Sequence, residues 1–187
     1  MPTRDLVLAA LFAAIIIVLG LVPPVMLGFI PVPITAQSLG VMLAGVVLGA
    51  KRGTIAVLLV LVLAAIGLPV LSGGRGGLAV FMAPTTGYLI GWVFAAMVTG
   101  YLSQIMVGRD QAGLVQGVNF FIAALMGGVI VLYGIGITYL ALITGMGFVK
   151  AFLGSLAFIP GDVLKAVIAA LAGRAVMAGY PLLPQRA

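Results

Sequence analysis

The stretch FIPGDVLKA, from Phe158 to Ala166, places two charged residues at the start of an otherwise apolar segment. Pro160 suits the first turn of a helix, where the N–H that proline lacks would have no helical partner. Asp162 falls in the same turn, where the helix dipole favours a negative charge, and Lys165 follows on the same helix face. Charges in so apolar a segment are costly, so the pair predicts a functional site. The alternative is an ion pair that only anchors the helix end at the membrane surface.

The composition of the whole chain indicates an integral membrane protein. Of its 187 residues, 64% are hydrophobic and 6% are charged, whereas a soluble domain has about 25% charged residues. No polar stretch is long enough for a soluble domain, so we predict a single membrane-embedded domain over residues 1–187. The net charge of +6 comes from basic residues spread along the chain. This distribution fits membrane topology signals better than nucleic-acid binding.

The residue types that are missing limit the possible chemistry. His and Cys are absent, and Asp5, Asp110 and Asp162 are the only acids. Disulfides, thiolate chemistry and typical zinc sites are therefore excluded. The chain also lacks the G-x-x-x-x-G-K-[ST] phosphate loop, so we expect no ATP hydrolysis by this chain alone. An intramembrane enzyme with Asp162 as general base would need a second group or a metal, so we predict no enzymatic activity, cofactor or metal.

Apolar runs separated by charges or turn residues predict an all-α bundle of six transmembrane helices. Five runs cover residues 6–22, 34–50, 54–67, 83–107 and 160–179. The sixth span lies within residues 111–149, which have no charge and exceed the length of about 20 residues that one span needs. This stretch holds either one helix followed by a long apolar loop, or two helices. We prefer one, because a further span over residues 137–159 would bury Lys150 in mid-helix.

With six spans, the charges divide unequally between the two membrane faces. One face receives Arg4, Lys51, Arg52, Arg109, Arg174 and Arg186, and the other receives Arg75, Lys150 and the Asp162–Lys165 pair. Basic residues concentrate on the cytoplasmic side, so this pattern predicts a multi-pass protein of the cell membrane with both termini cytoplasmic. The outward end then holds the residues that we predict to bind a substrate: Gln37, Arg75, Tyr88, Asp162 and Lys165.

Two loops at the outward end have unusual compositions. The first contains Pro23, Pro24, Pro31 and Pro33 and no charge, so we expect it to lie at the interface or to fold inward as a lid. In the second, four glycines bracket Arg75, and glycines can expose backbone N–H groups to a ligand. From this motif alone, a flexible surface loop is the alternative. Tyr88, at the boundary, could equally be an aromatic anchor.

Several blocks of the chain resemble the BioY family, the biotin-specific substrate-binding (S) components of energy-coupling-factor (ECF) vitamin transporters. They are IPVPITAQ at 30–37, GLPV at 67–70 with the following Gly-Gly-x-Gly-Gly, PTTGYL at 84–89, and FIPGDVLKA at 158–166. The resemblance extends over nearly the whole chain, and the blocks follow the family order. It implies a six-helix bundle that binds biotin near its outer face. It also implies a transmembrane coupling protein and two ATPase subunits as partners. Arg75, in place of Asn, and Thr86, in place of Gly, depart from the pattern.

The first apolar run carries two overlapping small-xxx-small pairs, Ala9/Ala13 and Ala10/Ala14. Such faces let helix backbones approach closely in lipid. From the residues alone, the contact could be with another helix of the same chain. The resemblance implies docking onto the coupling protein.

The chemistry of the biotin head group suits the charged pair. Its two N–H groups can donate to Asp162, and its carbonyl can accept from Lys165. Because the pair is formally neutral, it fits a neutral head group, and Arg75 is the candidate for the carboxylate of the tail. The alternative is a channel or a structural helix bundle. A channel would present a polar stripe along a whole helix, whereas the polar residues here crowd one end.

Overall fold

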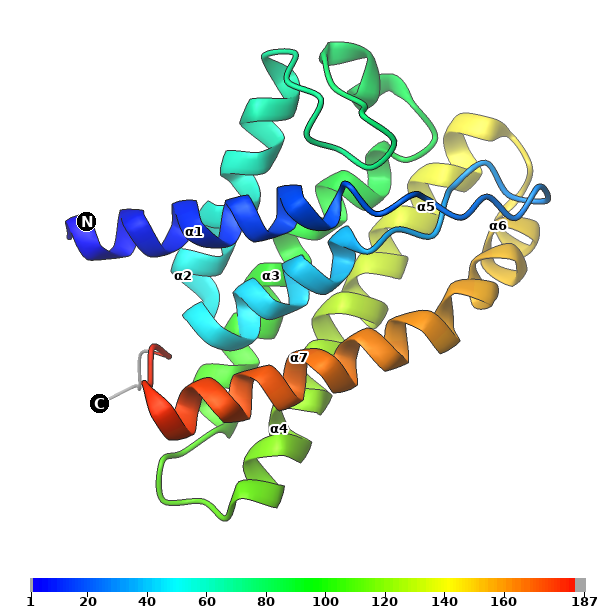
Figure 1. Cartoon of the computed structure of the whole chain (residues 1–187). Helices are drawn as coiled ribbons and strands as arrows, with labels where there is room; N and C mark the ends of the chain where they lie inside the picture. Colours follow the sequence, from blue (N-terminus) through cyan, green and yellow to red (C-terminus); the bar gives the residue numbers. More distant parts are fainter. Residues whose placement is uncertain (1, 184–187) are drawn as a thin grey trace.

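The computed structural model describes residues 2–183 and is all-helical over this range, with two isolated β-bridges and no strand (Figure 1). The helices are α1 (Thr3–Leu19), α2 (Gln37–Ala65), α3 (Thr86–Met106), α4 (Gly113–Leu125), α5 (Leu132–Thr144), α6 (Phe148–Ser155) and α7 (Ile159–Gly179). Short segments of 3₁₀ or π geometry are η1 (Leu78–Met82), η2 (Met126–Val131) and η3 (Leu156–Phe158). Within residues 2–183, four helical stretches are long and apolar enough to cross a membrane: Gln37–Ala65, Thr86–Met106, Gly113–Thr144 and Phe148–Gly179.

Within α2 the backbone turns sharply at Gly49. This residue has φ 79° and ψ 179°, a conformation that residues with a side chain rarely adopt. Beyond the turn the second half of α2 packs on the first, since a Cβ on Gly53 would lie 2.8 Å from the carbonyl oxygen of Ala44. Figure 1 shows the two arms of α2 running in different directions. The break predicted at Lys51 and Arg52 corresponds to this turn.

Residues 113–144 form one unbroken helical stretch, in agreement with the single span that we preferred. A short connection to α6 follows in place of the long apolar loop. α4 passes into α5 through the π-helical η2, where Gly127 and Gly128 allow close packing. A Cβ on Gly127 would collide with the hydroxyl of Thr99, and one on Gly128 with the side chain of Met42. After this long helix, α6 spans eight residues, and Ile159 begins α7 close to the predicted start of the last span.

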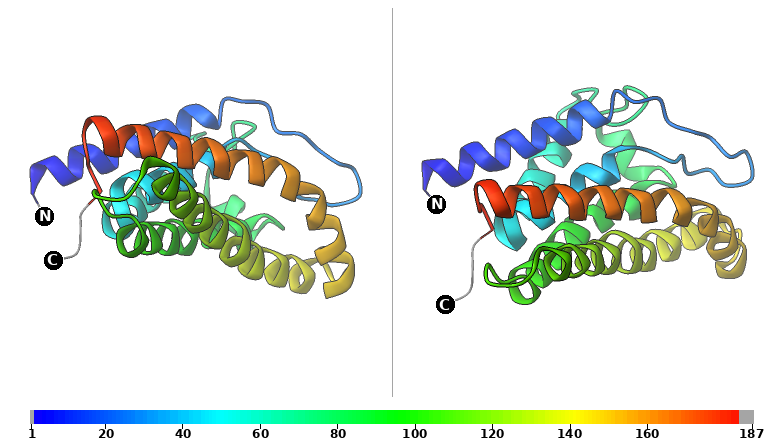
Figure 2. Two further views of the ribbon diagram at one scale, coloured as in Figure 1. Left: turned by 90° about the horizontal axis from the view of Figure 1, so that it is seen from below. Right: turned by 60° about the horizontal axis from the view of Figure 1, so that its bottom comes forward.

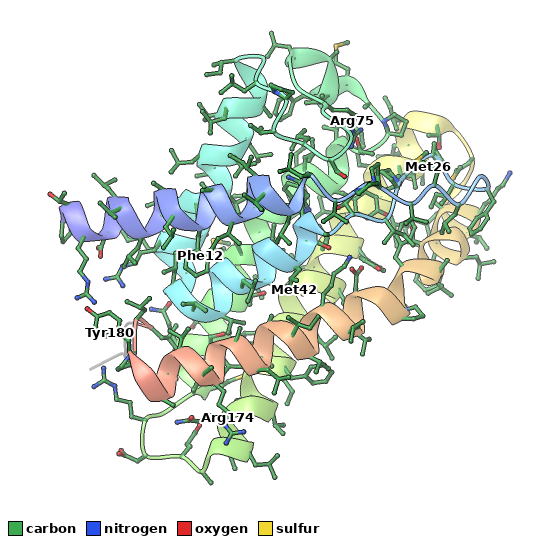
Figure 3. All side chains as sticks on the ribbon, in the orientation of Figure 1. Phe12, Met26, Met42, Arg75, Arg174 and Tyr180 are labelled. Atoms are coloured by element: carbon green, nitrogen blue, oxygen red, sulfur yellow. The ribbon has the colours of Figure 1, made fainter. Side chains whose placement is uncertain are left out.

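The start of α1 and the end of α7 lie at the same end of the bundle (Figure 2). Arg4 donates to the hydroxyl of Tyr180 at 3.2 Å, and its guanidinium lies 5.6 Å from the ring centroid. Arg52 pairs with Asp5 at 2.7 Å and donates to the carbonyl of Leu182. We call this the basic end, defined by Arg4, Lys51, Arg52, Arg109 and Arg174; Arg186 lies outside the described residues. Figure 3 shows Tyr180 at this end and Arg75 toward the other.

The two small-residue pairs of α1 have different surroundings. Ala9 and Ala13 are 0% and 4% exposed and belong to the core of the bundle, whereas Ala10 and Ala14 are exposed. A residue buried within its own chain offers no free surface to a partner. The docking expectation for Ala9 and Ala13 is therefore corrected, and Ala10 and Ala14 alone are left to carry it.

Candidate functional site

A cavity lies at the end of the bundle away from the basic end, among the first loop, the Arg75 loop and helices α2, α3, α5 and α7. Its lining includes all five residues predicted for the site: Gln37, Arg75, Tyr88, Asp162 and Lys165. The cavity has a volume of about 60 Å³. The cavity is therefore narrow in this structure.

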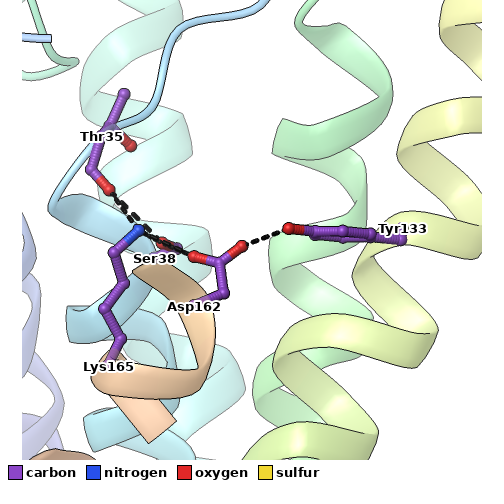
Figure 4. Close-up of polar contacts among 5 residues, drawn as sticks. All are labelled: Thr35, Ser38, Tyr133, Asp162 and Lys165. Carbon is purple, nitrogen blue, oxygen red and sulfur yellow. Dashed lines mark hydrogen bonds and ion pairs between the residues drawn. The ribbon is translucent and has the colours of Figure 1, made fainter. Parts of the chain in front are cut away.

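The Asp162–Lys165 pair lies on one wall of this cavity, in a network of hydrogen bonds (Figure 4). The Lys165 ammonium donates to Asp162 Oδ1 at 2.7 Å, to Ser38 Oγ at 2.9 Å and to the carbonyl oxygen of Thr35 at 2.8 Å. A lysine ammonium has three N–H groups, so all of its donors are engaged. On the other side, Tyr133 donates its hydroxyl to Asp162 Oδ2 at 2.5 Å. The pair thus joins α7 to the start of α2 and to α5.

The local sequence explains why the pair lies at a helix start. Pro160 occupies the first turn of α7, and Asp162 follows in the same turn, where its charge is stabilised by the helix dipole. Ser38, Thr35 and Tyr133 were not predicted from the sequence. Thr35 contributes a backbone carbonyl, which has no signal in the sequence. Tyr133 had a usable signal, because it is one of few polar side chains in a long apolar run.

An aromatic wall faces the ion pair. Tyr88 and Tyr133 meet edge to face, with ring centroids 6.4 Å apart and an interplanar angle of 76°. The hydroxyls of Tyr88 and Ser155 lie 2.9 Å apart, and Ser155 donates its own proton to the carbonyl of Ala151, so Tyr88 is the donor. Tyr88 is 9% exposed and presents its ring to the cavity, which excludes the role of an exposed membrane anchor. Gly136 makes room for this ring, since a Cβ there would lie 2.6 Å from it.

Gln37 is 1% exposed, and its amide is bonded to backbone groups of two other segments. Its Nε2 donates to the carbonyl oxygens of Ile16 at 3.1 Å and Val70 at 3.0 Å. Its Oε1 accepts from the backbone N–H of Ser72 at 2.8 Å. Both amide protons are therefore used within the protein, and the side chain has no donor left for a ligand.

Arg75 lies on the glycine-rich loop between α2 and η1. Its Nε donates to the carbonyl of Ser72 at 3.2 Å, and one terminal nitrogen donates to Thr85 Oγ1 at 3.3 Å. Partial burial lowers the pKa of Arg75 from its usual high value, but an arginine remains cationic. Within residues 2–183 no carboxylate pairs with it. Arg75 is thus a cation in the cavity lining without an acidic partner, a suitable group for an anionic ligand.

Thr86, which stands where the family pattern noted above has Gly, has a local structural role. Thr86 is the first residue of α3, and its hydroxyl proton is shared between the carbonyl oxygens of Ala83 at 2.8 Å and Val80 at 3.1 Å, which precede the helix. The Thr86 side chain therefore stabilises the connection between η1 and α3.

Comparison with known proteins gives a consistent result. The model of the BioY family matches residues 1–182. The chain is 73% identical to the biotin transporter BioY of Rhizobium etli over all of both chains. It is 48% identical to the biotin transporter BioY of Rhodobacter capsulatus, over 92% of this chain and 93% of that one. Among solved structures, the crystal structure of the S component for biotin from an ECF-type ABC transporter superposes with a TM-score of 0.88. That protein is 35% identical, with 97% of each chain covered.

The match extends over nearly the whole chain, in sequence and in fold, and it includes the four blocks on which the resemblance rests. On this evidence the chain belongs to the BioY family.

Proposed function

We propose that this protein takes up biotin, as the biotin-binding S component of an ECF-type transporter. The observation that carries the proposal is the convergence on one cavity of a neutral ion pair, an aromatic wall and an arginine that has no acidic partner within residues 2–183. This chemistry complements a polar, uncharged head group, an apolar body and a carboxylate tail. The relatives and the superposed structure, which are described as proteins for biotin, support the same ligand. Membership in a transporter family supports a non-enzymatic role with biotin as transported ligand, in a single substrate-binding domain.

The ion pair would bind the head group of biotin. Asp162 Oδ2 accepts one hydrogen bond, from Tyr133, and a carboxylate oxygen has a second lone pair for a biotin N–H. Lys165, in contrast, has no free N–H group. To donate to the biotin carbonyl, it would have to exchange its bond to the carbonyl of Thr35 or to Ser38. Arg75 would bind the carboxylate of the tail.

This exchange supports a lid role for the first loop. Thr35 ends that loop, and the β-bridge between Val25 and Ile34 ties the end of the loop to its beginning. Because the cavity is narrow, the loop would move when biotin enters. A fluorophore at exposed Phe29 should change its emission on biotin addition. An unchanged signal at saturating biotin would count against the lid.

We propose six membrane crossings with both termini cytoplasmic. The crossings are α1, the two arms of α2 on either side of Gly49, α3, the continuous 113–144 stretch and α7. The basic end would then face the cytoplasm. The native chain has no Cys, so single cysteines can be labelled with an impermeant reagent. Cysteine at Arg75 should react from outside, and labelling only from the cytoplasm would overturn this topology.

A transmembrane coupling protein and two ATPase subunits are the proposed partners. Ala10 and Ala14 form the exposed small-residue face of α1, on which the coupling protein would pack closely. Ala10→Trp should abolish copurification with the coupling protein and leave biotin binding intact. Ala13→Trp is the matched control. Because Ala13 is buried, it should destabilise the bundle itself, and equal effects of the two changes would contradict the proposed face.

Calorimetry on the detergent-solubilised protein tests the function directly. We expect saturable binding of biotin. Lipoate is the control, because it shares the acid tail but lacks the head group with N–H and carbonyl groups. Comparable binding of both ligands, or of neither, would reject the proposal and leave a channel or structural bundle as the alternative.

A further inference from the structure

The start of α2 connects the two halves of the cavity through consecutive residues. Ser38 accepts from Lys165, on the side of the ion pair. Gln37 bonds to the glycine-rich loop that carries Arg75, through Val70 and Ser72. The same Gln37 amide bonds to Ile16 of α1. The first turn of α2 therefore bonds to α1, to the ion pair and to the glycine-rich loop, and it fixes their positions relative to one another.

The bond pattern of Gln37 fixes the orientation of its amide. Two of its partners are carbonyl oxygens, which require the NH₂ group, and the third is an N–H, which requires the oxygen. Rotating the amide by half a turn would break all three bonds. Close packing restricts the side chain further, because a Cβ on Gly20 would lie 2.7 Å from Nε2. The side chain of Gln37 is thus held in one orientation and joins α1 to the glycine-rich loop.

Hydrogen bonds connect Gln37 to Arg75 through the backbone of Ser72. Gln37 accepts from the N–H of Ser72, and the carbonyl of Ser72 accepts from Arg75 Nε. The hydroxyl of Ser72 also donates to the carbonyl of Val22, which ties it to the first loop. The loop has no regular secondary structure beyond the bridge between Leu71 and Arg75. Arg75 exchanges two backbone hydrogen bonds with Leu71, the neighbour of Ser72, so the contacts that hold Leu71 and Ser72 also position the backbone of Arg75.

We infer that Gln37 is a positioning residue for the anionic end of the ligand. It acts through Ser72 to hold the guanidinium of Arg75 over the cavity and makes no donor contact to the ligand itself. This inference rests on the proposed biotin function. It predicts that loss of Gln37 weakens the recognition of a carboxylate and leaves recognition of the head group nearly unchanged.

The test compares biotin with biotinamide, whose tail is uncharged, in calorimetry on Gln37→Met and Arg75→Ala. Methionine keeps the length and apolar volume of the side chain but forms none of the three hydrogen bonds. We expect each variant to weaken biotin about tenfold and biotinamide less than about threefold. In the double variant, Gln37→Met should add less than about threefold to the effect of Arg75→Ala, because the two residues act as a unit.

Gln116→Met is the matched control. Gln116 is also buried and donates its amide to two loop carbonyls, those of Gly108 at 2.9 Å and Arg109 at 3.3 Å, but it lies at the basic end. Its variant should lower thermal stability without changing the ratio of the two affinities. If Gln37→Met is not monodisperse, Gln37→Asn provides the same comparison with a shortened amide.

Three outcomes separate the two proposals. A parent protein that binds neither ligand rejects the biotin function itself. A parent that binds biotin, with Gln37→Met weakening both ligands equally, overturns the positioning role and makes Gln37 a general structural residue. If Arg75→Ala leaves the ratio of the affinities for biotin and biotinamide unchanged, a residue other than Arg75 recognises the tail. That outcome overturns the positioning role of Gln37 but leaves the biotin function intact.

Discussion

Two ion pairs of the same length, 2.7 Å, lie at opposite ends of this bundle. At the basic end Arg52 binds Asp5, with side chains 19% and 15% exposed. At the cavity end Lys165 binds Asp162, with side chains 14% and 7% exposed. By distance alone the pairs are indistinguishable, and their exposures differ little.

Their surroundings distinguish them. Arg52 also donates to the carbonyl of Leu182, so that pair ties α1, α2 and the segment after α7 together. The Asp162–Lys165 pair lies against a cavity with an aromatic wall. In our proposal, only the ion pair with accessible space beside it belongs to a binding site. If this difference holds, substitutions in the two pairs should change the affinity for biotin to different extents.

Lys165→Ala should have the largest effect. It removes a charged donor and leaves Asp162 buried without a counter-charge, an arrangement more costly than the loss of both charges. A hydrogen bond to a charged group contributes about 1.5–3 kcal/mol, and each tenfold change in Kd corresponds to about 1.4 kcal/mol. We expect calorimetry to show biotin affinity reduced well beyond tenfold. Thermal unfolding must be measured in parallel, and a folded variant that binds biotin like the parent would reduce this pair to a helix anchor.

Asp162→Asn should reduce biotin affinity by about tenfold or more. The amide keeps an acceptor oxygen but loses the negative charge that strengthens the bond to a biotin N–H. Calorimetry on monodisperse protein is again the measurement. Asp5→Asn makes the same chemical change in the other ion pair and serves as control. Equal effects of the two substitutions would remove the proposed difference between the pairs.

Tyr133→Phe should have a smaller effect, about threefold in biotin affinity. The hydroxyl donates to Asp162, and in our proposal it orients this carboxylate and does not bind the ligand itself. The ring remains, so the aromatic wall with Tyr88 is preserved. Titration with biotin measures the change. A loss as large as that of Asp162→Asn would instead indicate that the hydroxyl binds biotin directly.

Arg52→Ala should leave biotin affinity within about twofold of the parent, since partly exposed ion pairs contribute mainly to local stability. The variant loses the bonds to Asp5 and to the carbonyl of Leu182. We therefore expect a lower unfolding temperature in a detergent thermal-shift assay. Weakened biotin binding in a folded Arg52→Ala protein would mean that the two ends of the bundle are coupled.

The sequence by itself determined the class of the protein, most helix positions and the residues that we propose for the site. Charges are so rare and so costly in an apolar chain that each one is informative. Asp162, Lys165 and Arg75 were therefore identified, and they line one cavity with Gln37 and Tyr88. The start of the last helix was predicted because proline and aspartate have well-defined preferences for a first helical turn.

Only the tertiary structure decided which face of each helix is buried and which backbone groups complete the site. Ala9 and Ala10 are neighbours with the same side chain, but consecutive residues of a helix point in directions about 100° apart, so one is in the core and the other is exposed. The carbonyl of Thr35 bonds to Lys165, yet every residue has such a carbonyl. The hydrogen bonds of the Gln37 amide join segments far apart in the chain. These features depend on packing between distant segments, which residue composition and local spacing do not encode.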